Sequence, residues 1–420
     1  MYQQLRAVVD ASGIWSGNRE RTHAFLLSPS VYQITPAQRD ELQDLGRAIF
    51  DCLSGLSHIG VIAYDQSLNY TGAWRLVRKV FSTGVPQIYQ ELQGMNVKDI
   101  PRLLKVDLMV DQDGNFKIAE IDGHNKHGLG YSTLGKRFRQ AIYPDARALP
   151  GTVKLLVTEM QRTGQDVAKL FFADQERFYL PEFEVAQQEF AAEGATLQLL
   201  PELQVSSAQL QDGIFLDLPF LYKRTALYTP IIASYRTGQV RFVIPPKPFM
   251  GAKGLLAIVR NDTGDELLES LLQTFIKPKS LELVRRYIPP TLLVGKMAAG
   301  MEQVQALTAT NRYVLKESIS SGMKGTVFSD DPAFNQTLKV ASATQLNWIL
   351  QEEVVNQPQT FSWYENGGNR APVLRTADDW FMRVTVQYVQ HQLADVIVTA
   401  RRDKAVHGAK DCIQIGTVIV

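Results

Sequence analysis

Cysteine is nearly absent from this sequence: among 420 residues only Cys52 and Cys412 carry thiols. Two thiols so far apart do not indicate a disulfide framework, and they fit a reducing compartment with buried structural cysteines. The sequence also lacks any run of eighteen or more apolar residues, and its first ten residues lack the pattern of a signal peptide. We therefore expect a cytoplasmic protein without a membrane span.

An excess of charge of either sign is also missing. The 44 basic residues nearly balance the 43 acidic residues, which leaves a net charge of +1. This balance gives no support for a nucleic-acid or membrane-surface partner. The hydrophobic share of 45% and the charged share of 21% are typical of a globular protein with a sizeable core. The length predicts two or three domains.

Several catalytic signatures are missing too. There is no G-x-S-x-G motif, no paired Cys/His nucleophile and no Walker motif, and no G-x-G-x-x-G follows a first strand. His124 and His127 stand three residues apart with no third soft ligand nearby, so zinc is not expected. We interpret both as loop imidazoles without a ligand role; the alternative is contact with a phosphate or a substrate.

The stretch "KVDLMVDQDGNFKIAEID", residues 105–122, predicts a β-hairpin, because Asp113-Gly114 is a strong signal for a two-residue turn. This turn would pair Val110 with Lys117, Asp107 with Glu120, and Lys105 with Asp122. A four-residue loop would keep that register, whereas a three-residue loop would break it. The predicted polar face carries Lys105, Asp107, Met109, Ile118, Glu120 and Asp122. The predicted apolar face carries Val106, Leu108, Val110, Lys117, Ala119 and Ile121.

Directly opposed carboxylates destabilise a strand pair. A divalent cation reverses the sign of that interaction, and Mg²⁺ commonly binds through one or two carboxylates together with substrate phosphates. The alternative is a solvated outer strand face that happens to be acidic.

The chain reads as three regions. Residues 1–150 are mostly helical before the hairpin, and Thr35, Pro36 and Gln38 predict the start of a capped helix. Its expected core stripe is Leu42, Leu45, Ile49 and Leu53. In residues 151–246 a strand (169–173), a helix (181–194) and a strand (195–200) form a βαβ unit, which predicts a Rossmann-like domain with a parallel sheet. We expect its ligand end near Asp174 to Arg177.

Residues 247–420 contain the remaining motifs. We expect helices from Lys253, over 265–276 and around 343–350, then antiparallel strands in the tail. In "YVLKESISSGMKGT" a strand ends in Lys316, and a Ser/Gly loop follows that could approach phosphate oxygens closely. In "LQEEVV" an amide and carboxylates interrupt an apolar strand and could read an adenine edge. Taken alone, a mobile hairpin loop with a solvated lysine and a half-buried edge strand are the better explanations of these two motifs.

In their order these parts resemble the ATP-grasp superfamily, because "KGLL", "IPPT", "YVLK–SSGMKG" and "LQEEVV" are similar to its nucleotide half. The comparable metal-binding part, Asp107 with Glu120-Ile-Asp122, comes first here. That permuted order resembles the glutathionylspermidine synthetase-like and eukaryotic glutathione synthetase-like branch, in which a Rossmann-like substrate domain is inserted between the halves. The resemblance covers about residues 100 to 420 and implies an α+β fold.

The resemblance also implies site residues. The metal carboxylates match Asp107, Glu120 and Asp122, and the phosphate lysines match Lys253 and Lys316. The covering loop matches Ser320, Ser321, Gly322, Met323, Lys324 and Gly325. The adenine hinge matches Gln351, Glu352 and Val354. The family usually has Asn where Asp122 stands and Arg where Lys105 stands. Lys105 is the catalytic cation by position, but lysine lacks the bidentate fork of arginine, so Arg102, Arg383 or Arg401 could take the phosphate role in its place.

The implied activity is that of an ATP- and Mg²⁺-dependent ligase, which joins a carboxylate to an amine through an acylphosphate. Its expected partners are small-molecule acids and amines, with a homodimer as a further expectation. The alternatives are a phosphotransferase on the same fold, a nucleotide-binding protein without catalysis, and a metal-only hydrolase. The last leaves the Ser/Gly loop and the hinge unexplained. The Tyr222, Lys223 and Arg224 run and Arg177 are candidates for holding an anionic substrate, with surface solvation as the alternative.

Overall fold

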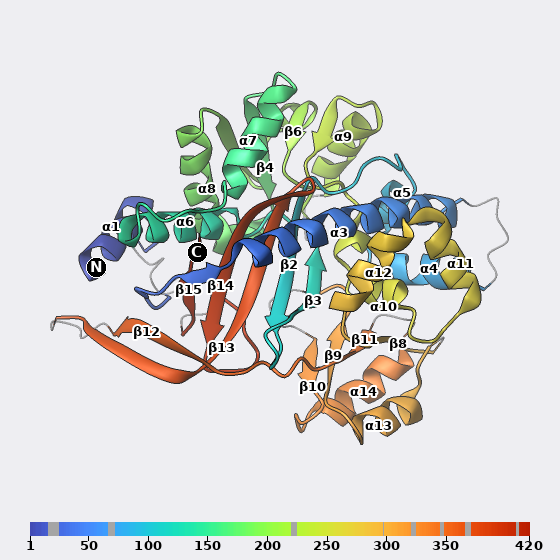
Figure 1. The fold of residues 1–420 in the computed structure, drawn as a ribbon. Coiled ribbons are helices and arrows are strands. Elements are labelled where there is room, and N and C mark those ends of the chain that lie inside the picture. Colours follow the sequence, from blue (N-terminus) through green and yellow to red (C-terminus); the bar gives the residue numbers. More distant parts are fainter. Residues whose placement is uncertain are drawn as a thin grey trace. The chain divides into compact units, whose positions relative to one another are not determined.

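A computed structural model describes residues 1–15, 25–65, 72–219, 225–296, 298–320, 325–344, 348–365, 371–408 and 411–420. These residues form a mixed α/β protein with several sheets, as expected for the predicted α+β class (Figure 1). The chain divides into two compact units. The first contains Met1–Leu42, Asn125–Pro245 and Pro358–Val420, and the second contains Gln43–His124 and Pro246–Gln357. The division into domains 1–150, 151–246 and 247–420 stays a prediction.

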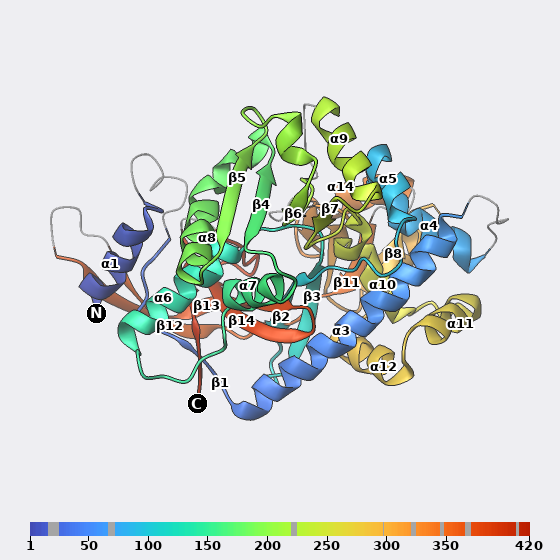
Figure 2. The ribbon, with the colours of Figure 1, turned by 90° about the horizontal axis from the view of Figure 1, so that it is seen from above.

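The first unit contains the predicted parallel sheet. Its strands lie in the order β5-β4-β6-β7, and every neighbouring pair is parallel. Their bounds are β4 Val167–Phe172, β5 Thr196–Pro201, β6 Gly213–Phe215 and β7 Val240–Phe242. Helix α8 (Leu180–Ala192) connects β4 to β5, which confirms the βαβ unit (Figure 2). The other elements here are α6 (Leu129–Ile142), α7 (Thr152–Arg162), η2 (Asp174–Tyr179), η3 (Ser207–Leu210) and α9 (Thr225–Arg236).

The rest of the first unit comes from both ends of the chain. The tail forms antiparallel strands as predicted: β12 (Gln359–Glu365), β13 (Val373–Val389), β14 (Gln392–Arg401) and β15 (Ile413–Ile415). Strand β1 (Tyr32–Ile34) pairs in parallel with β16 (Thr417–Ile419). Helix α1 (Tyr2–Ser12) packs with α6 in a hydrophobic cluster that includes the buried Cys412. Cys52 is buried as well, and both cysteines are free thiols, as predicted.

The long helix α3 (Pro36–Ala63) begins in the first unit and continues in the second. Its predicted start is confirmed, because the backbone N–H of Gln38 donates to Thr35 Oγ1 and that of Thr35 donates to Gln38 Oε1. The stripe of Leu42, Leu45, Ile49 and Leu53 is buried. By length and composition α3 could cross a membrane, but 67% of its most apolar window is buried inside the protein. That burial is typical of a core helix.

The second unit contains the hairpin of β2 (Leu103–Val110) and β3 (Phe116–Asp122) and the antiparallel sheet β10-β9-β11-β8. The strands of this sheet are β8 Thr291–Val294, β9 Tyr313–Glu317, β10 Thr326–Phe328 and β11 Trp348–Glu352. The helical elements are α4 Ala73–Ser82, α5 Gln87–Gln93, η4 Pro248–Gly251, α10 Gly254–Arg260, α11 Glu266–Phe275, α12 Pro278–Tyr287, α13 Met301–Thr308 and α14 Phe334–Ala343.

Helices α13 and α14 pack on one face of the β10-β9-β11-β8 sheet through a hydrophobic cluster that includes Leu315, Leu338 and Leu350 (Figure 1). The prediction of a helix around 343–350 is wrong, because α14 ends at Ala343 and β11 begins at Trp348. The apolar residues Trp348, Ile349 and Leu350 favour a strand because they are buried between neighbouring strands of the sheet.

Candidate functional site

The hairpin of β2 and β3 opposes the acids as the sequence predicts. The structure pairs Asp107 with Glu120 and Lys105 with Asp122 in an antiparallel register. Opposed residues share one face of a sheet. Two carboxylates and an ion pair therefore lie together on the polar face of the hairpin.

The turn differs from the prediction. Five residues, 111–115, connect the strands, so Val110 pairs with Phe116 rather than with Lys117. The Asp111 carboxylate orders this loop by accepting from the backbone N–H groups of Asp113 and Asn115. An odd loop length shifts the register by one residue.

A β-bulge restores the register. Leu108 pairs with Ile118 but Asp107 pairs with Glu120, so Ala119 is the extra residue. Ile118 is therefore buried on the apolar face beside Leu108, whereas the prediction placed it on the polar face. Lys117 pairs with Met109 on the opposite face, which corrects its predicted position as well.

Asp122 contacts the side chains of Lys105 and His124. Its Oδ2 lies 2.8 Å from Lys105 Nζ, and its Oδ1 lies 3.0 Å from His124 Nδ1. The backbone N–H of His124 also donates to Oδ1, at 3.3 Å. Burial alone would raise the pKa of Asp122, but Lys105 and His124 hold it well below its usual range. Asp122 is therefore a fixed negative charge.

Lys253 reaches the acids from a different element. It is the N-cap of α10, it is buried, and its Nζ lies 3.0 Å from Glu120 Oε1. The same ammonium donates to the backbone carbonyl of Ser320 at 3.1 Å. The start of α10 is fixed as well, because Gly254 N–H donates to Ser318 Oγ. Lys253 thus joins the hairpin acids to the start of the predicted covering loop.

Lys316 lies on β9 and faces the same acids. Its ammonium donates to Gln351 Oε1 at 2.6 Å and to the carbonyl of the bulged Ala119 at 3.2 Å. Burial lowers the pKa of Lys316 to about 8; Glu120 and Asp107 oppose that shift, whereas the neighbouring Lys253 adds to it. The structure therefore brings both predicted phosphate lysines to the two opposed carboxylates.

Gln351, the first residue of the predicted adenine hinge, contacts Lys316 and Thr291. It is buried, its Oε1 accepts from Lys316, and its Nε2 donates to Thr291 Oγ1 at 3.2 Å. Because Gln351 is itself held by Thr291, it positions the Lys316 ammonium next to the hairpin. The sequence alone did not show that this glutamine faces inward.

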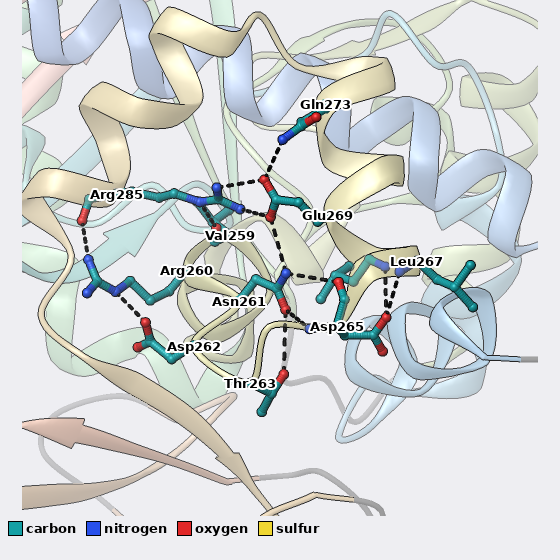
Figure 3. A network of polar contacts seen from close by, with 11 residues as sticks. Val259, Arg260, Asn261, Asp262, Thr263, Asp265, Leu267, Glu269, Gln273 and Arg285 are labelled. Carbon is teal, nitrogen blue, oxygen red and sulfur yellow. Dashed lines mark hydrogen bonds and ion pairs between the residues drawn. The ribbon is translucent and has the colours of Figure 1, made fainter.

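A polar network fixes the other end of α10 (Figure 3). Glu269 on α11 accepts from both Nη atoms of Arg285 on α12, at 2.9 and 2.6 Å, and from Asn261 Nδ2 at 3.1 Å. Arg285 Nε also donates to the carbonyl of Val259 at 2.8 Å. Asn261 ends α10 in the left-handed conformation. The network joins α10, α11 and α12 and so limits the positions available to Lys253.

The predicted covering loop is described only at its ends. Ser320 Oγ donates to the carbonyl of Glu317, and Gly325 has a positive φ of 67°. A Cβ at Gly325 would also crowd Glu317, so this return turn requires glycine. Ser321, Gly322, Met323 and Lys324 lie outside the described residues, as do Tyr222, Lys223 and Arg224.

The end of β11 borders a cavity of about 340 Å³. Glu352 and Val354 of the predicted hinge line it, together with the hairpin loop 111–113 and Pro289 and Pro290. The walls thus combine apolar side chains with charged ones. The cavity lies where the hinge and the hairpin loop meet.

The three arginines that the sequence offered as catalytic cations lie in different parts of the structure. Arg102 is exposed directly before β2, and Arg401 forms an ion pair with Asp411 at 3.0 Å. Arg383 belongs to the first unit, on β13 opposite Thr399. A catalytic role for Arg102 and Arg383 stays a prediction.

The first unit contains a buried ionic cluster that the sequence analysis missed. Lys126 is fully buried, 2.8 Å from Glu176 and 3.2 Å from Asp217. Glu176 follows β4 and Asp217 follows β6, at the carboxyl ends of adjacent parallel strands. Lys126 thus occupies the predicted ligand end, while Arg177 pairs with Asp174. The only signal in the sequence was a lysine between the two histidines of "GHNKHG".

Comparisons with known proteins add little. No family model matches the sequence, and no curated protein matches it. Among solved structures, a proposed gamma-glutamylcysteine synthetase from Methylobacillus flagellatus KT is 11% identical and has a TM-score of 0.36. The match covers 76% of this chain and 80% of that one. A TM-score this low supports neither a shared fold nor a shared function.

Proposed function

We propose that this chain is an ATP-dependent ligase that joins a carboxylate to an amine through an acylphosphate, releasing ADP and phosphate. One observation carries the proposal. Two lysines from separate elements, Lys253 and Lys316, converge on one pair of opposed carboxylates. Clustered ammonium groups beside paired acids suit a site that binds polyphosphate together with a divalent cation.

We further propose a permuted ATP-grasp fold of the branch named above, with a Rossmann-like insertion at 151–246. The element order supports it, because the hairpin precedes β9, the covering loop and β11 along the chain. The parallel sheet of β4 to β7 lies within the span of the proposed insertion.

The contacts along the hairpin suggest how ATP would lie. The cavity at Glu352 and Val354 borders the hairpin loop, Lys316 contacts Ala119, and Lys253 contacts Glu120 further along β3. We place the adenine in the cavity and the phosphates along the two lysines. The nucleotide would then follow the hairpin from its loop toward Glu120.

Mg²⁺ fits the opposed pair of Asp107 and Glu120. No group of three or more His, Cys, Asp or Glu positioned to hold a metal ion was found within the described ranges. One or two carboxylates suffice for Mg²⁺ when substrate phosphates complete its coordination. When bound, the ion supplies positive charge to the phosphate oxygens.

The chain's own residues have two tasks in this reaction. Lys253 and Lys316 hold the terminal phosphates, so that a substrate carboxylate oxygen can attack the γ-phosphorus while the bond to ADP breaks. The covering loop that begins at Ser320 excludes water from the acylphosphate. The amine then attacks the acyl carbon, phosphate leaves, and the amine gives up a proton. No side-chain nucleophile is needed, in agreement with the motifs missing from the sequence.

The first test is calorimetric titration of MgATP into the wild type and Glu120→Gln. We expect metal-dependent binding by the wild type, weakened at least about tenfold in the variant because one of two opposed carboxylates is lost. Glu302→Gln, an exposed change on α13, is the matched control and should bind as the wild type does.

Absence of MgATP binding by the wild type would contradict the proposal. If ATP binds, acids and amines are screened for ADP release and the products are identified. An amide with free phosphate supports a ligase, and a phosphorylated acceptor supports a phosphotransferase instead.

A further inference from the structure

We propose that Asp122 is a positioning residue that holds Lys105 and His124 beside the carboxylates Asp107 and Glu120, and that it is not a metal ligand. The inference rests on the proposed function where it concerns the metal and the reaction. Its structural part, an anchor for the side chains of Lys105 and His124, does not depend on ATP.

Both oxygens of Asp122 are already engaged. Lys105 Nζ lies 2.8 Å from Oδ2, and His124 approaches Oδ1 through its ring nitrogen and its backbone N–H. The side chains of Lys105, Asp122 and His124 are 12%, 17% and 14% exposed. Ion pairs this far removed from water interact strongly, and a metal ligand role would require Asp122 to give up one of them.

Glu120 differs from Asp122 in this respect. Its side chain is 27% exposed, and Lys253 Nζ lies 3.0 Å from one of its carboxylate oxygens. It stands directly opposite Asp107, whereas Asp122 stands opposite Lys105. The hairpin therefore has one pair of two acids, Asp107 and Glu120, and one acid–base pair, Asp122 and Lys105. Only the pair of two acids attracts a cation.

Asp122 would orient the ammonium group of Lys105. Lys105 and Asp107 are two residues apart on β2, so their side chains share the polar face. An ammonium held there can contact the transferring phosphoryl group or the substrate carboxylate. Because an ammonium is a point charge on a flexible stem, it depends on an anchor such as Asp122 for its direction.

The ring of His124 also lies close to Gly251 of η4. A Cβ at Gly251 would collide with the His124 ring, so the absence of a side chain there makes room for the imidazole. Gly251 comes two residues before Lys253. The η4 turn thus makes room for the His124 ring and is followed closely by Lys253, the lysine that contacts Glu120.

The decisive experiment measures metal binding separately from turnover. Mn²⁺ is titrated in the presence of a non-hydrolysable ATP analogue, with the free ion followed by electron paramagnetic resonance. We expect Asp122→Asn to keep the Mn²⁺ affinity within about twofold of wild type while kcat falls about 10²-fold, as for a misplaced group. Glu120→Gln should weaken Mn²⁺ binding about tenfold or more. Equal losses of affinity in the two variants would overturn the proposal.

A second measurement needs neither metal nor nucleotide. In protein with ¹⁵N-labelled histidine, we expect Asp122→Asn to shift the ring resonances of His124, and Gly251→Ala to do the same. Gly300→Ala, where a Cβ meets nothing within 4 Å, is the matched control. An unmoved His124 resonance in Asp122→Asn would refute the anchor even in a protein that binds no ATP. Failure of Mn²⁺ and nucleotide binding by the wild type would instead refute the proposed function.

A paired substitution adds a third outcome. The residues that differ from the resembling family, Lys105 and Asp122, contact each other. If they act as one unit, Lys105→Arg combined with Asp122→Asn should recover kcat relative to Asp122→Asn alone, because residues in contact couple energetically. Purely additive losses would contradict the coupling.

Discussion

At the scale of single residues, the chemistry of the candidate site depends on how far each ammonium group is removed from water. Lys316 is the clearest case, because burial lowers its pKa to about 8 from an ordinary 10.5. The unfolded chain has no such shift. Between about pH 8 and 10.5 the unfolded state therefore binds more protons at this residue, and the folded state gains stability as pH rises.

Lys316→Met removes that contribution. We expect the difference in melting temperature, wild type minus variant, to increase as pH rises from 8 to 10. Calorimetry at a series of pH values measures this difference. Lys279→Met, which removes an exposed lysine on α12, is the matched control. A difference that is constant with pH would contradict the lowered pKa.

The sequence predicted several single-residue features. The sequence predicted that Asp107 stands opposite Glu120, and the structure shows this pairing. The sequence could not show that Gln351 turns inward to Lys316, since that contact joins different elements. The burial of Lys126 was equally hidden, because Glu176 and Asp217 come from distant segments.

At the scale of elements, the sequence predicted the correct register for the acids of the hairpin but the wrong length for its loop. The loop is longer than expected, and the bulge at Ala119 compensates for it. Bulges leave no clear mark in a sequence, so this compensation was not predictable. It also has a use, because the carbonyl of Ala119 accepts from Lys316.

The network around Glu269 leads to a prediction at the scale of elements. Hydrogen bonds from Arg285 are the largest cause that lowers the pKa of Glu269, to about 2 from 4.5. Its stabilising effect is therefore complete above pH 4.5 and is lost as pH falls toward 2. We expect Glu269→Gln to lower the free energy of unfolding by about 1–3 kcal/mol at pH 7, because charged hydrogen bonds are lost.

Urea denaturation at pH 7 and at pH 3 measures this effect. The loss caused by Glu269→Gln should be smaller at pH 3, where the wild type has lost part of the same contribution. Glu266→Gln, an exposed change in the first turn of α11, is the control. Equal losses at both pH values would show that the network does not stabilise through the charge of Glu269.

At the scale of the whole molecule, the buried ionic cluster of the first unit lies at the edge of the parallel sheet where a ligand would be expected. Carboxyl ends of parallel strands often hold ligands, but here Lys126 bridges the residues that follow β4 and β6. Its burial would lower the pKa of Lys126, yet Asp217 and Glu176 raise it overall. Burial raises the pKa of Asp217 to about 6 in spite of Lys126.

Lys126→Met leaves two carboxylates buried without their cation. We expect it to destabilise the first unit by about 3–5 kcal/mol, visible as faster hydrogen exchange in the amides of β4 and β6. Asp217→Asn should cost less, because burial raises the pKa of Asp217 to about 6, so that its neutral form is easier to reach than that of an ordinary carboxyl. The reverse order of effects would contradict the assigned charges.

Each compact unit is assembled from segments that are far apart along the chain. The hairpin acids are synthesised with Gln43–His124, whereas Lys253 and Lys316 arrive with Pro246–Gln357. At about 5–20 residues per second, the earlier segment waits roughly ten to fifty seconds on the ribosome for its partner. During that interval Asp107 and Glu120 oppose each other without Lys253 and Lys316, the two lysines that contact the hairpin in the folded protein. The second unit is therefore expected to complete this site only after most of the chain has been made.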